Sequence, residues 1–151
     1  MPSNSSSSLR PDPVPSFDED SGAAIHTYLR LYDDRNGDSH FEEVEIPLHK
    51  LESQSSTAIL ATPYQEATHH GLRIVPVGWE RDWGPASRRM IAVYLSGQGE
   101  IEASDGDVRR LSPGTVLLAE DTTGRGHRVK VIGDEPVTVV HIVLPDSGRA
   151  A

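Results

Sequence analysis

His127 is the residue whose type and setting best suit chemistry. It comes directly before a strand-like run of alternating residues and after the segment Gly124-Arg125-Gly126. Imidazole titrates close to neutral pH, so it can accept or donate a proton. Glu120 and Asp121 come shortly before it. Since consecutive residues of an extended chain face opposite sides, at most one of these acids enters the same pocket and tunes the imidazole. We expect His127 to be a catalytic acid or base, and we count Asp121 among the candidate substrate-binding residues.

A second candidate set lies upstream and consists of Trp83, Arg88, Met90 and Tyr94. On a strand with alternating faces, Arg88, Met90 and Tyr94 point the same way. A planar guanidinium can hold a carboxylate or an enolate, so we assign Arg88 to catalysis as an anion clamp. We expect Trp83, Met90 and Tyr94 to bind the apolar part of the substrate.

These side chains need a framework, and the sequence predicts one made of β-strands. Short apolar or alternating runs recur between turn residues, and no segment has the apolar stripe of an amphipathic helix. Such short strands at this spacing are typical of a sandwich or a jelly-roll barrel. The expected strands are His26 to Tyr32, Phe41 to Pro47, Thr57 to Thr62, Leu72 to Val77, Arg89 to Ser96, Glu100 to Ala103, Thr115 to Ala119, Arg128 to Ile132 and Val137 to Leu144.

The segment from Gly71 to Leu144 resembles the cupin family. A strand from Met90 is followed by an alternating strand and the turn Asp105-Gly106, and Leu111-Ser112-Pro113-Gly114 then turns the chain toward the strand of His127. Proline presets φ and glycine accepts positive φ, which suits a sharp reversal. The resemblance implies an all-β, cupin-like jelly-roll barrel in which His127 points inward.

The metal cage that this resemblance implies is incomplete. The family pattern has two histidines and a glutamate on the first part of the barrel, and counting back from Gly97 these positions fall at Gly84, Ala86 and Met90. None of these side chains binds a hard or borderline cation. Conceivable substitutes are Glu80, Asp82, His69, His70 and His141. We expect no metal and no cofactor.

Composition limits the remaining possibilities. The chain has 151 residues and no cysteine, which excludes disulfides, thiolate metal sites and cysteine nucleophiles. Its net charge of -9 repels phosphate backbones. The apolar runs are far shorter than the roughly 20 residues of a membrane-spanning helix. We expect a cytoplasmic protein with no nucleic-acid or membrane partner.

The same patterns predict one domain. Residues 1–22 are rich in Ser, Pro and Asp and are expected to form a disordered tail, residues 23–145 a cupin-like β-barrel, and residues 146–151 a short polar tail. We also expect a homodimer, paired through an exposed sheet edge that the strands between His26 and Pro47 could supply.

Three functions are compatible with these residues. The first is a metal-independent isomerase, dehydratase or cyclase that binds a small carbonyl or carboxylate metabolite and transfers a proton through His127. The second is a non-catalytic ligand sensor or binding module that uses the same barrel. The third is a metal-dependent dioxygenase or isomerase that combines His127 with Glu80, Asp82 or His69.

Overall fold

Every regular element of the described chain is a β-strand. The computed structural model describes residues 25–51 and 57–146. No helix in these ranges is long and apolar enough to cross a membrane. The strands are β1 (Ile25–Asp33), β2 (Ser39–Pro47), β3 (His49–Lys50), β4 (Leu60–Ala61), β5 (His69–Val75), β6 (Glu80–Gly84), β7 (Met90–Ser96), β8 (Gln98–Ala103), β9 (Val108–Leu111), β10 (Val116–Ala119), β11 (His127–Ile132) and β12 (Val137–Val143).

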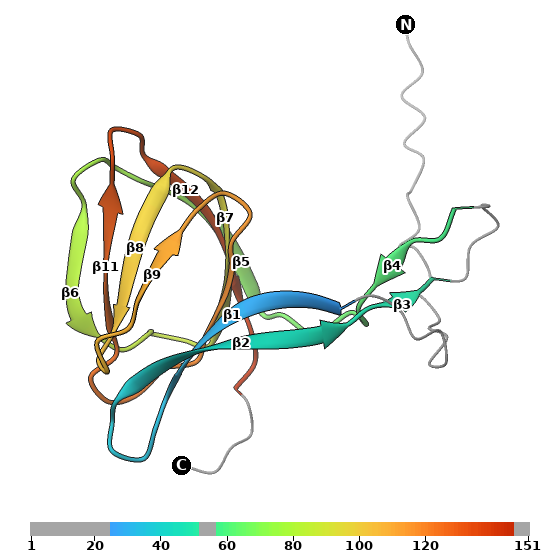
Figure 1. Ribbon diagram of the computed structural model, residues 1–151, viewed down its shortest axis with the longest axis horizontal. Helices are drawn as coiled ribbons and strands as arrows, with labels where there is room; N and C mark the ends of the chain where they lie inside the picture. The colour runs from blue at the N-terminus through green and yellow to red at the C-terminus, as the bar shows by residue number, and fades with distance from the viewer. Residues whose placement is uncertain (1–24, 52–56, 147–151) are drawn as a thin grey trace, which may run out of the picture. The chain divides into compact units, whose positions relative to one another are not determined.

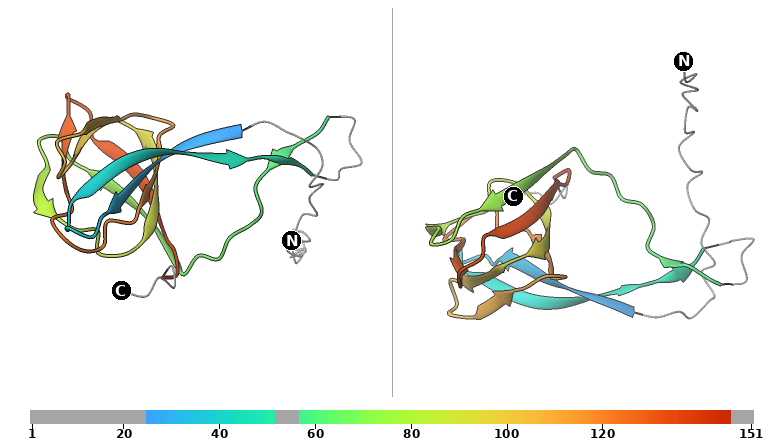
Figure 2. Two further views of the ribbon diagram at one scale, coloured as in Figure 1. Left: turned by 60° about the horizontal axis from the view of Figure 1, so that its bottom comes forward. Right: turned by 90° about the horizontal axis from the view of Figure 1, so that it is seen from above.

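The eight strands from β5 to β12 form a jelly roll. They pair as one long hairpin, β5 with β12, β6 with β11, β7 with β10 and β8 with β9. The hairpin is wound so that β5, β12, β7 and β10 lie in one sheet and β6, β11, β8 and β9 lie in another, and the two sheets face each other (Figures 1 and 2). The predicted all-β jelly roll is confirmed by this strand order.

Two further strands extend the first sheet. β1 runs parallel to β10, with Leu29 opposite Leu117, and β2 follows β1 at the edge. The six-stranded sheet therefore ends in β2 on one side and β5 on the other. An edge from the N-terminal strands is thus present for the expected homodimer, which stays a prediction.

The chain divides into two compact units. Of the described residues, 26–46 and 65–146 form the unit with the two sheets, and residues 25, 47–51 and 57–64 belong to the other, in which β3 pairs with β4. The strand expected over Thr57 to Thr62 is shorter, at Leu60–Ala61. The tail expected over 1–22 lies outside the described residues, as does all but the first residue of the tail expected over 146–151.

The core of the larger unit lies between its two sheets. Alternating residues of each strand point inward, and β8 shows this clearly, since Gly99, Ile101 and Ala103 are buried while their neighbours are partly exposed. Leu31 and Leu117 meet this face from the six-stranded sheet. Burial of such side chains contributes about 25 cal/mol per Å² of apolar surface, which is the main stabilising term of the fold.

The predicted corner at Pro113-Gly114 is confirmed. Gly114 has a φ of +91° between β9 and β10, and the N–H of Thr115 donates to the carbonyl of Ser112 at 2.9 Å. Gly97, between β7 and β8, has a φ of +78°, and a Cβ there would lie 2.3 Å from the carbonyl oxygen of Pro136. Glycine is therefore required at this second reversal for both its φ and its size.

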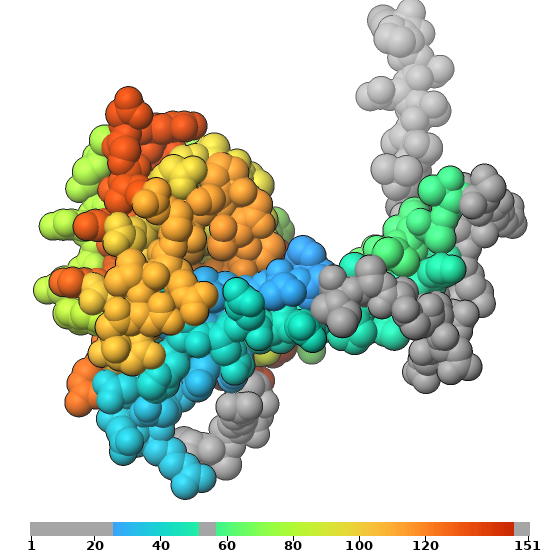
Figure 3. Space-filling model, in the orientation of Figure 1, coloured from blue at the N-terminus to red at the C-terminus, as the bar shows by residue number. Residues whose placement is uncertain are grey.

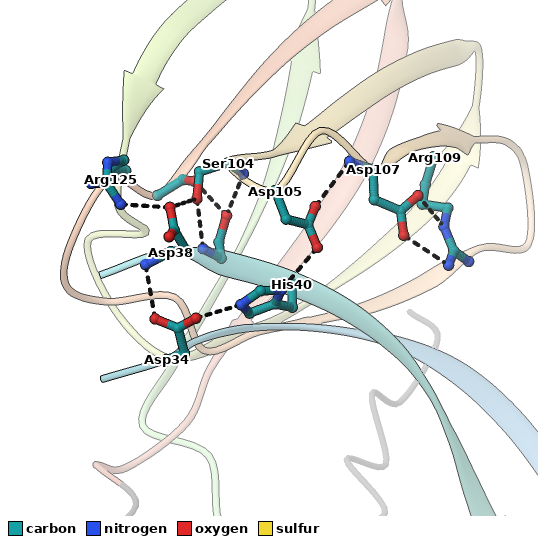
Figure 4. Close-up of polar contacts among 10 residues, drawn as sticks. Asp34, Asp38, His40, Ser104, Asp105, Asp107, Arg109 and Arg125 are labelled. Atoms are coloured by element: carbon teal, nitrogen blue, oxygen red, sulfur yellow. Dashed lines mark hydrogen bonds and ion pairs between the residues drawn. The ribbon is translucent and has the colours of Figure 1, made fainter. Parts of the chain in front are cut away.

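A cluster of polar side chains ties the turn between β1 and β2 to the turn between β8 and β9 (Figure 4). The space-filling view shows these two parts of the chain against each other at the surface (Figure 3). His40 contacts a carboxylate with each ring nitrogen, since Nε2 lies 2.6 Å from Asp34 and Nδ1 lies 2.8 Å from Asp105. Beside it, the backbone N–H groups of Ser39 and Ser104 each donate to the other residue's hydroxyl. We call the contacts of Asp34, His40 and Asp105 the histidine clasp.

Both ring nitrogens of His40 can donate to these carboxylates only when the imidazole is protonated. The hydrogen bond to Asp34, with that to Asp105 next, raises the pKa of His40 above its ordinary value. The hydrogen bond from His40 likewise lowers the pKa of Asp34. Tyr32 packs against the imidazole with ring centroids 5.6 Å apart. The clasp is therefore fully formed in the pH range above the lowered pKa of Asp34 and below the raised pKa of His40, where the carboxylate is ionised and the imidazole is protonated.

We predict that the histidine clasp makes stability fall as the pH rises. Because the pKa of His40 is higher in the folded state, its protonation stabilises the fold, and this contribution is fully present below the unfolded pKa of about 6.5. The contribution is lost as the pH rises through the folded pKa. His40→Gln should lower the thermal midpoint at pH 6 by a few degrees (~1 kcal/mol or less for exposed pairs) and should flatten the decline toward pH 9. His70→Gln, an exposed histidine on β5, is the matched control. Parallel pH profiles for His40→Gln and the wild type would contradict the clasp.

Candidate functional site

A cavity of about 610 Å³ lies between the two sheets of the larger unit. This is within the usual range for sites that bind a small molecule. It exists because several inward positions are small, among them Gly99, Ala92 and Ala119, so the side chains do not fill the barrel. The lining comprises Arg73, Ile74, Val75, Pro76, Trp79, Arg81, Ala86, Ser87, Met90, Ala92, Tyr94, Gly99, Ile101, Leu111, Leu117, Ala119, His127, Val129, Lys130, Val131, Val137, Val139 and His141.

His127 lies in the wall of this cavity with a buried carboxylate beside it. Its Nδ1 is 2.6 Å from Oδ2 of Asp121, and Asp121 is fully buried. Nε2 of His127 has no hydrogen-bond partner in the part of the chain that the structure describes. An Nδ1–H that donates to Asp121 leaves the lone pair of Nε2 free for a ligand in the cavity.

The Asp121 carboxylate depends on His127. Burial raises the pKa of Asp121, and the hydrogen bond and charge of His127 oppose that rise. The other oxygen, Oδ1, is buried without a hydrogen-bond partner among the described residues. Glu120, the neighbouring acid, faces elsewhere and accepts hydrogen bonds from Arg30 and Arg89. Of the two acids considered from the sequence, Asp121 is thus the one that meets His127.

Backbone packing fixes where the strand of His127 begins. Gly126 has a φ of +69°, and a Cβ there would lie 2.0 Å from the carbonyl oxygen of Gly84. The carbonyl of Gly126 also accepts a hydrogen bond from the buried hydroxyl of Ser39 at 2.6 Å. Two residues after Gly84, the N–H of Ala86 donates to the carbonyl of Asp121 at 2.9 Å. Glycine at position 126 therefore lets β6 and β11 approach closely beside the imidazole.

Two predicted binding residues, Met90 and Tyr94, line the cavity from β7. They lie on the inner face with Ala92, as the alternation of the strand predicted. Burial raises the pKa of Tyr94 to about 12. Its hydroxyl therefore stays protonated at neutral pH and can donate a hydrogen bond to a ligand.

Arg88 and Trp83 are not placed as the sequence suggested. Arg88 is exposed and does not line the cavity, because β7 begins only at Met90 and the alternation does not extend back to it. Trp83 is also outside the lining, and the guanidinium of Arg128 lies 5.2 Å from its ring. The reason is an irregularity in β6. Arg81 pairs with Val129 and Gly84 pairs with His127, so β6 has one more residue than β11 between these two pairs. The extra residue reverses the alternation before Trp83.

The conceivable metal ligands do not converge on His127. Glu80 and Asp82 lie in β6 rather than in a loop, and they line a separate depression of about 480 Å³ together with Glu100, Glu102 and Arg128. His69 is exposed, and its Nδ1 contacts the hydroxyl of Thr68. No group of three or more His, Asp or Glu that could hold a metal occurs in residues 25–51 and 57–146. With Gly84, Ala86 and Met90 at the family positions, the donor set does not fit a metal cage.

Four ionisable residues of the cavity lining were not assigned to the site from the sequence, namely Arg73, Arg81, Lys130 and His141. Arg73 carries a signal that could have found it, since it interrupts the apolar run from Leu72 to Val77 and has the same strand phase as Val75. His141, which the sequence suggested as a conceivable metal ligand, lines the cavity wall. Burial, followed by the charge of Arg73, lowers the pKa of His141.

No protein family model matches the chain, and no curated protein is detectably similar to it. Solved structures with a partial likeness to this chain include the following three. SPY1581 of Streptococcus pyogenes, a conserved protein of unknown function, is 18% identical over 58% of this chain and 72% of its own, with a TM-score of 0.39. The cupin domain of Cnp3 from Schizosaccharomyces pombe is 18% identical over 80% of this chain and 85% of its own, with a TM-score of 0.35. An RmlC-like cupin protein from Desulfovibrio desulfuricans is 16% identical over 89% of this chain and 92% of its own, with a TM-score of 0.34.

We predict that the approach of β6 to β11 makes Gly126 the least replaceable of the positive-φ glycines near the site. Gly106→Ala, in the open turn between β8 and β9 where a Cβ would meet nothing within 4 Å, should cost about 1–2 kcal/mol of unfolding free energy from φ strain alone. Gly126→Ala should cost at least about 3 kcal/mol because the clash with Gly84 adds to that strain. Urea denaturation measures both, and equal losses would show that the close approach is not present.

Proposed function

We propose that the cavity binds a small metabolite with a carbonyl or carboxylate group and that His127 transfers a proton to or from it. The reaction class is a metal-independent isomerisation, dehydration or cyclisation, because each of these moves a proton next to a carbonyl without a redox step. The observation that carries the proposal is the pair of His127 and Asp121. One ring nitrogen is held by a buried carboxylate at 2.6 Å while the other is free at the cavity wall.

His127 acts as the base in this proposal. Nε2 takes a proton from the carbon next to the carbonyl. The electron pair of the broken C–H bond forms a carbon–carbon double bond, and the π pair of the carbonyl moves to its oxygen, which gives an enolate. The imidazolium formed is stabilised by the Asp121 carboxylate. Return of the proton to another atom of the substrate completes an isomerisation, and loss of a hydroxyl group protonated by His127 completes a dehydration.

The opposite wall supplies a neutral donor and apolar contacts. Tyr94 lies on the six-stranded sheet, and its raised pKa keeps the phenol protonated, so it can donate to the enolate oxygen. Ala92, Leu117 and Met90 form the apolar surface around it. Removal of water from such a surface favours binding of a short carbon skeleton and strengthens the hydrogen bonds made there.

Proton transfer can be tested before the substrate is known. Small 2-keto acids, 3-hydroxy acids and their esters are incubated with the protein in D₂O, and NMR records deuterium at the carbon next to the carbonyl. We predict exchange with the wild type and a fall of at least about 100-fold for His127→Gln, the size expected when a general base is lost. Asp121→Asn should also slow exchange, and His70→Gln should not. Circular dichroism confirms that each variant is folded.

A second variant separates binding from catalysis. Ala92→Leu places a larger side chain in the cavity and should abolish ligand binding and exchange together, whereas His127→Gln should retain binding. Ligands that bind the wild type without any exchange would favour the sensor function and contradict catalysis. A stoichiometric transition metal in the purified active protein would contradict a metal-independent reaction.

A further inference from the structure

The cavity lining has basic side chains, although the chain as a whole is acidic. The chain has 23 acidic and 14 basic residues, yet the described lining contains neither Asp nor Glu, and Arg73, Arg81 and two histidines belong to it. Lys130 also borders the cavity, but it pairs with Glu100 on the outer face of β11 and β8. Asp121, the nearest acid to the site, lies outside the lining and is engaged by His127. The cavity of a strongly acidic protein therefore presents cationic groups to its contents, which favours an anionic ligand.

Arg73 is the cationic group with the least compensation. It makes no ion pair or hydrogen bond within the described residues. By contrast, the guanidinium of Arg81 donates to the carbonyl of Pro85 at 2.8 Å. Lys130 also borders the acidic depression with Glu80 and Glu100, which partly offsets its charge. An unpaired guanidinium at the wall of a cavity is suited to a carboxylate, which its planar fork can bind with two hydrogen bonds.

His141 lies beside Arg73 on the same face. Arg73 is paired with Val139 across β5 and β12, and His141 is paired with Gly71, so Arg73 and His141 are diagonal neighbours on the inner face. A Cβ at Gly71 would meet nothing within 4 Å, so open space lies next to His141. Burial, followed by the charge of Arg73, lowers the pKa of His141 and so favours the neutral imidazole, which can donate one hydrogen bond without adding a full charge.

The two functional walls face each other. His127 is on the four-stranded sheet, whereas Arg73 and His141 are on the six-stranded sheet, and all three line one cavity. We propose that Arg73, assisted by His141, binds the carboxylate of a small organic acid and thereby presents its reactive carbon to His127. This inference rests on the proposed function, since it names the substrate class of that site. It also assigns the anion clamp to Arg73 instead of Arg88.

A pair of probes that differ in charge tests this inference. Benzoate and benzamide have nearly the same shape, and their binding is followed by NMR through the methyl groups of Ala92 and Leu117, at constant ionic strength. We predict that the wild type binds benzoate at least about tenfold more tightly than benzamide, as expected for a charge-assisted hydrogen bond. Arg73→Gln should bring the two affinities within about twofold of each other, mainly by weakening benzoate. His141→Gln should reduce the preference by less.

Arg88→Gln is the matched control, since it removes the same charge from an exposed arginine outside the cavity lining. It should keep the full preference for benzoate. Equal binding of both probes by the wild type would overturn the carboxylate site and leave the cavity function intact. Failure of both probes to shift the cavity methyl groups would overturn the proposed function itself. A preference that survives Arg73→Gln would assign the carboxylate to other residues and contradict the proposal.

Discussion

The contact between His127 and the buried carboxylate of Asp121 is the interaction on which the functional site depends. A fully buried carboxylate is costly unless another group compensates it, and His127 is the side chain that does so among the described residues. The same contact fixes the imidazole ring and leaves Nε2 at the cavity wall. Stability and reactivity are therefore coupled at this pair, because removal of either partner leaves the other without its compensation.

The fold places this pair through backbone constraints at both of its ends. β11 can begin beside β6 only because position 126 has no side chain and accepts a positive φ. The segment after β6 is held by the hydrogen bond from Ala86 to Asp121. Ser39, next to the histidine clasp, bonds to the carbonyl of Gly126. The turn between β1 and β2 thus supports the residue that precedes His127, although β1 and β2 are not part of the eight-stranded hairpin.

Much of the fold could be predicted from the sequence, because its signals are local. The Pro113-Gly114 corner, the turn at Asp105-Gly106 and the alternation of β7 each depend on neighbouring residues only. The placement of Trp83 could not be predicted, since it depends on an extra residue in β6 that appears only when β6 pairs with β11. Arg88 was misplaced because the start of a strand is set by tertiary pairing, and alternation was extended two residues too far.

The candidate site was predictable to a similar extent. Met90 and Tyr94 were found from strand phase, His127 was found from its residue type and the cupin resemblance, and all three line the cavity. The choice of Asp121 over Glu120 needed the structure, because consecutive residues carry no signal about which one turns inward. Arg73 and His141 come from β5 and β12, which are paired across the fold, and no sequence spacing reveals that they lie on one wall opposite His127.

The most direct test of the account is the protonation of the two ring nitrogens of His127 at neutral pH, measured by ¹⁵N NMR of histidine-labelled protein. The account predicts that Nδ1 carries the proton and donates to Asp121, that Nε2 is unprotonated, and that Asp121→Asn disturbs this arrangement. A proton on Nε2, with Nδ1 accepting a hydrogen bond from a protonated Asp121, would leave no base at the cavity wall and would contradict it.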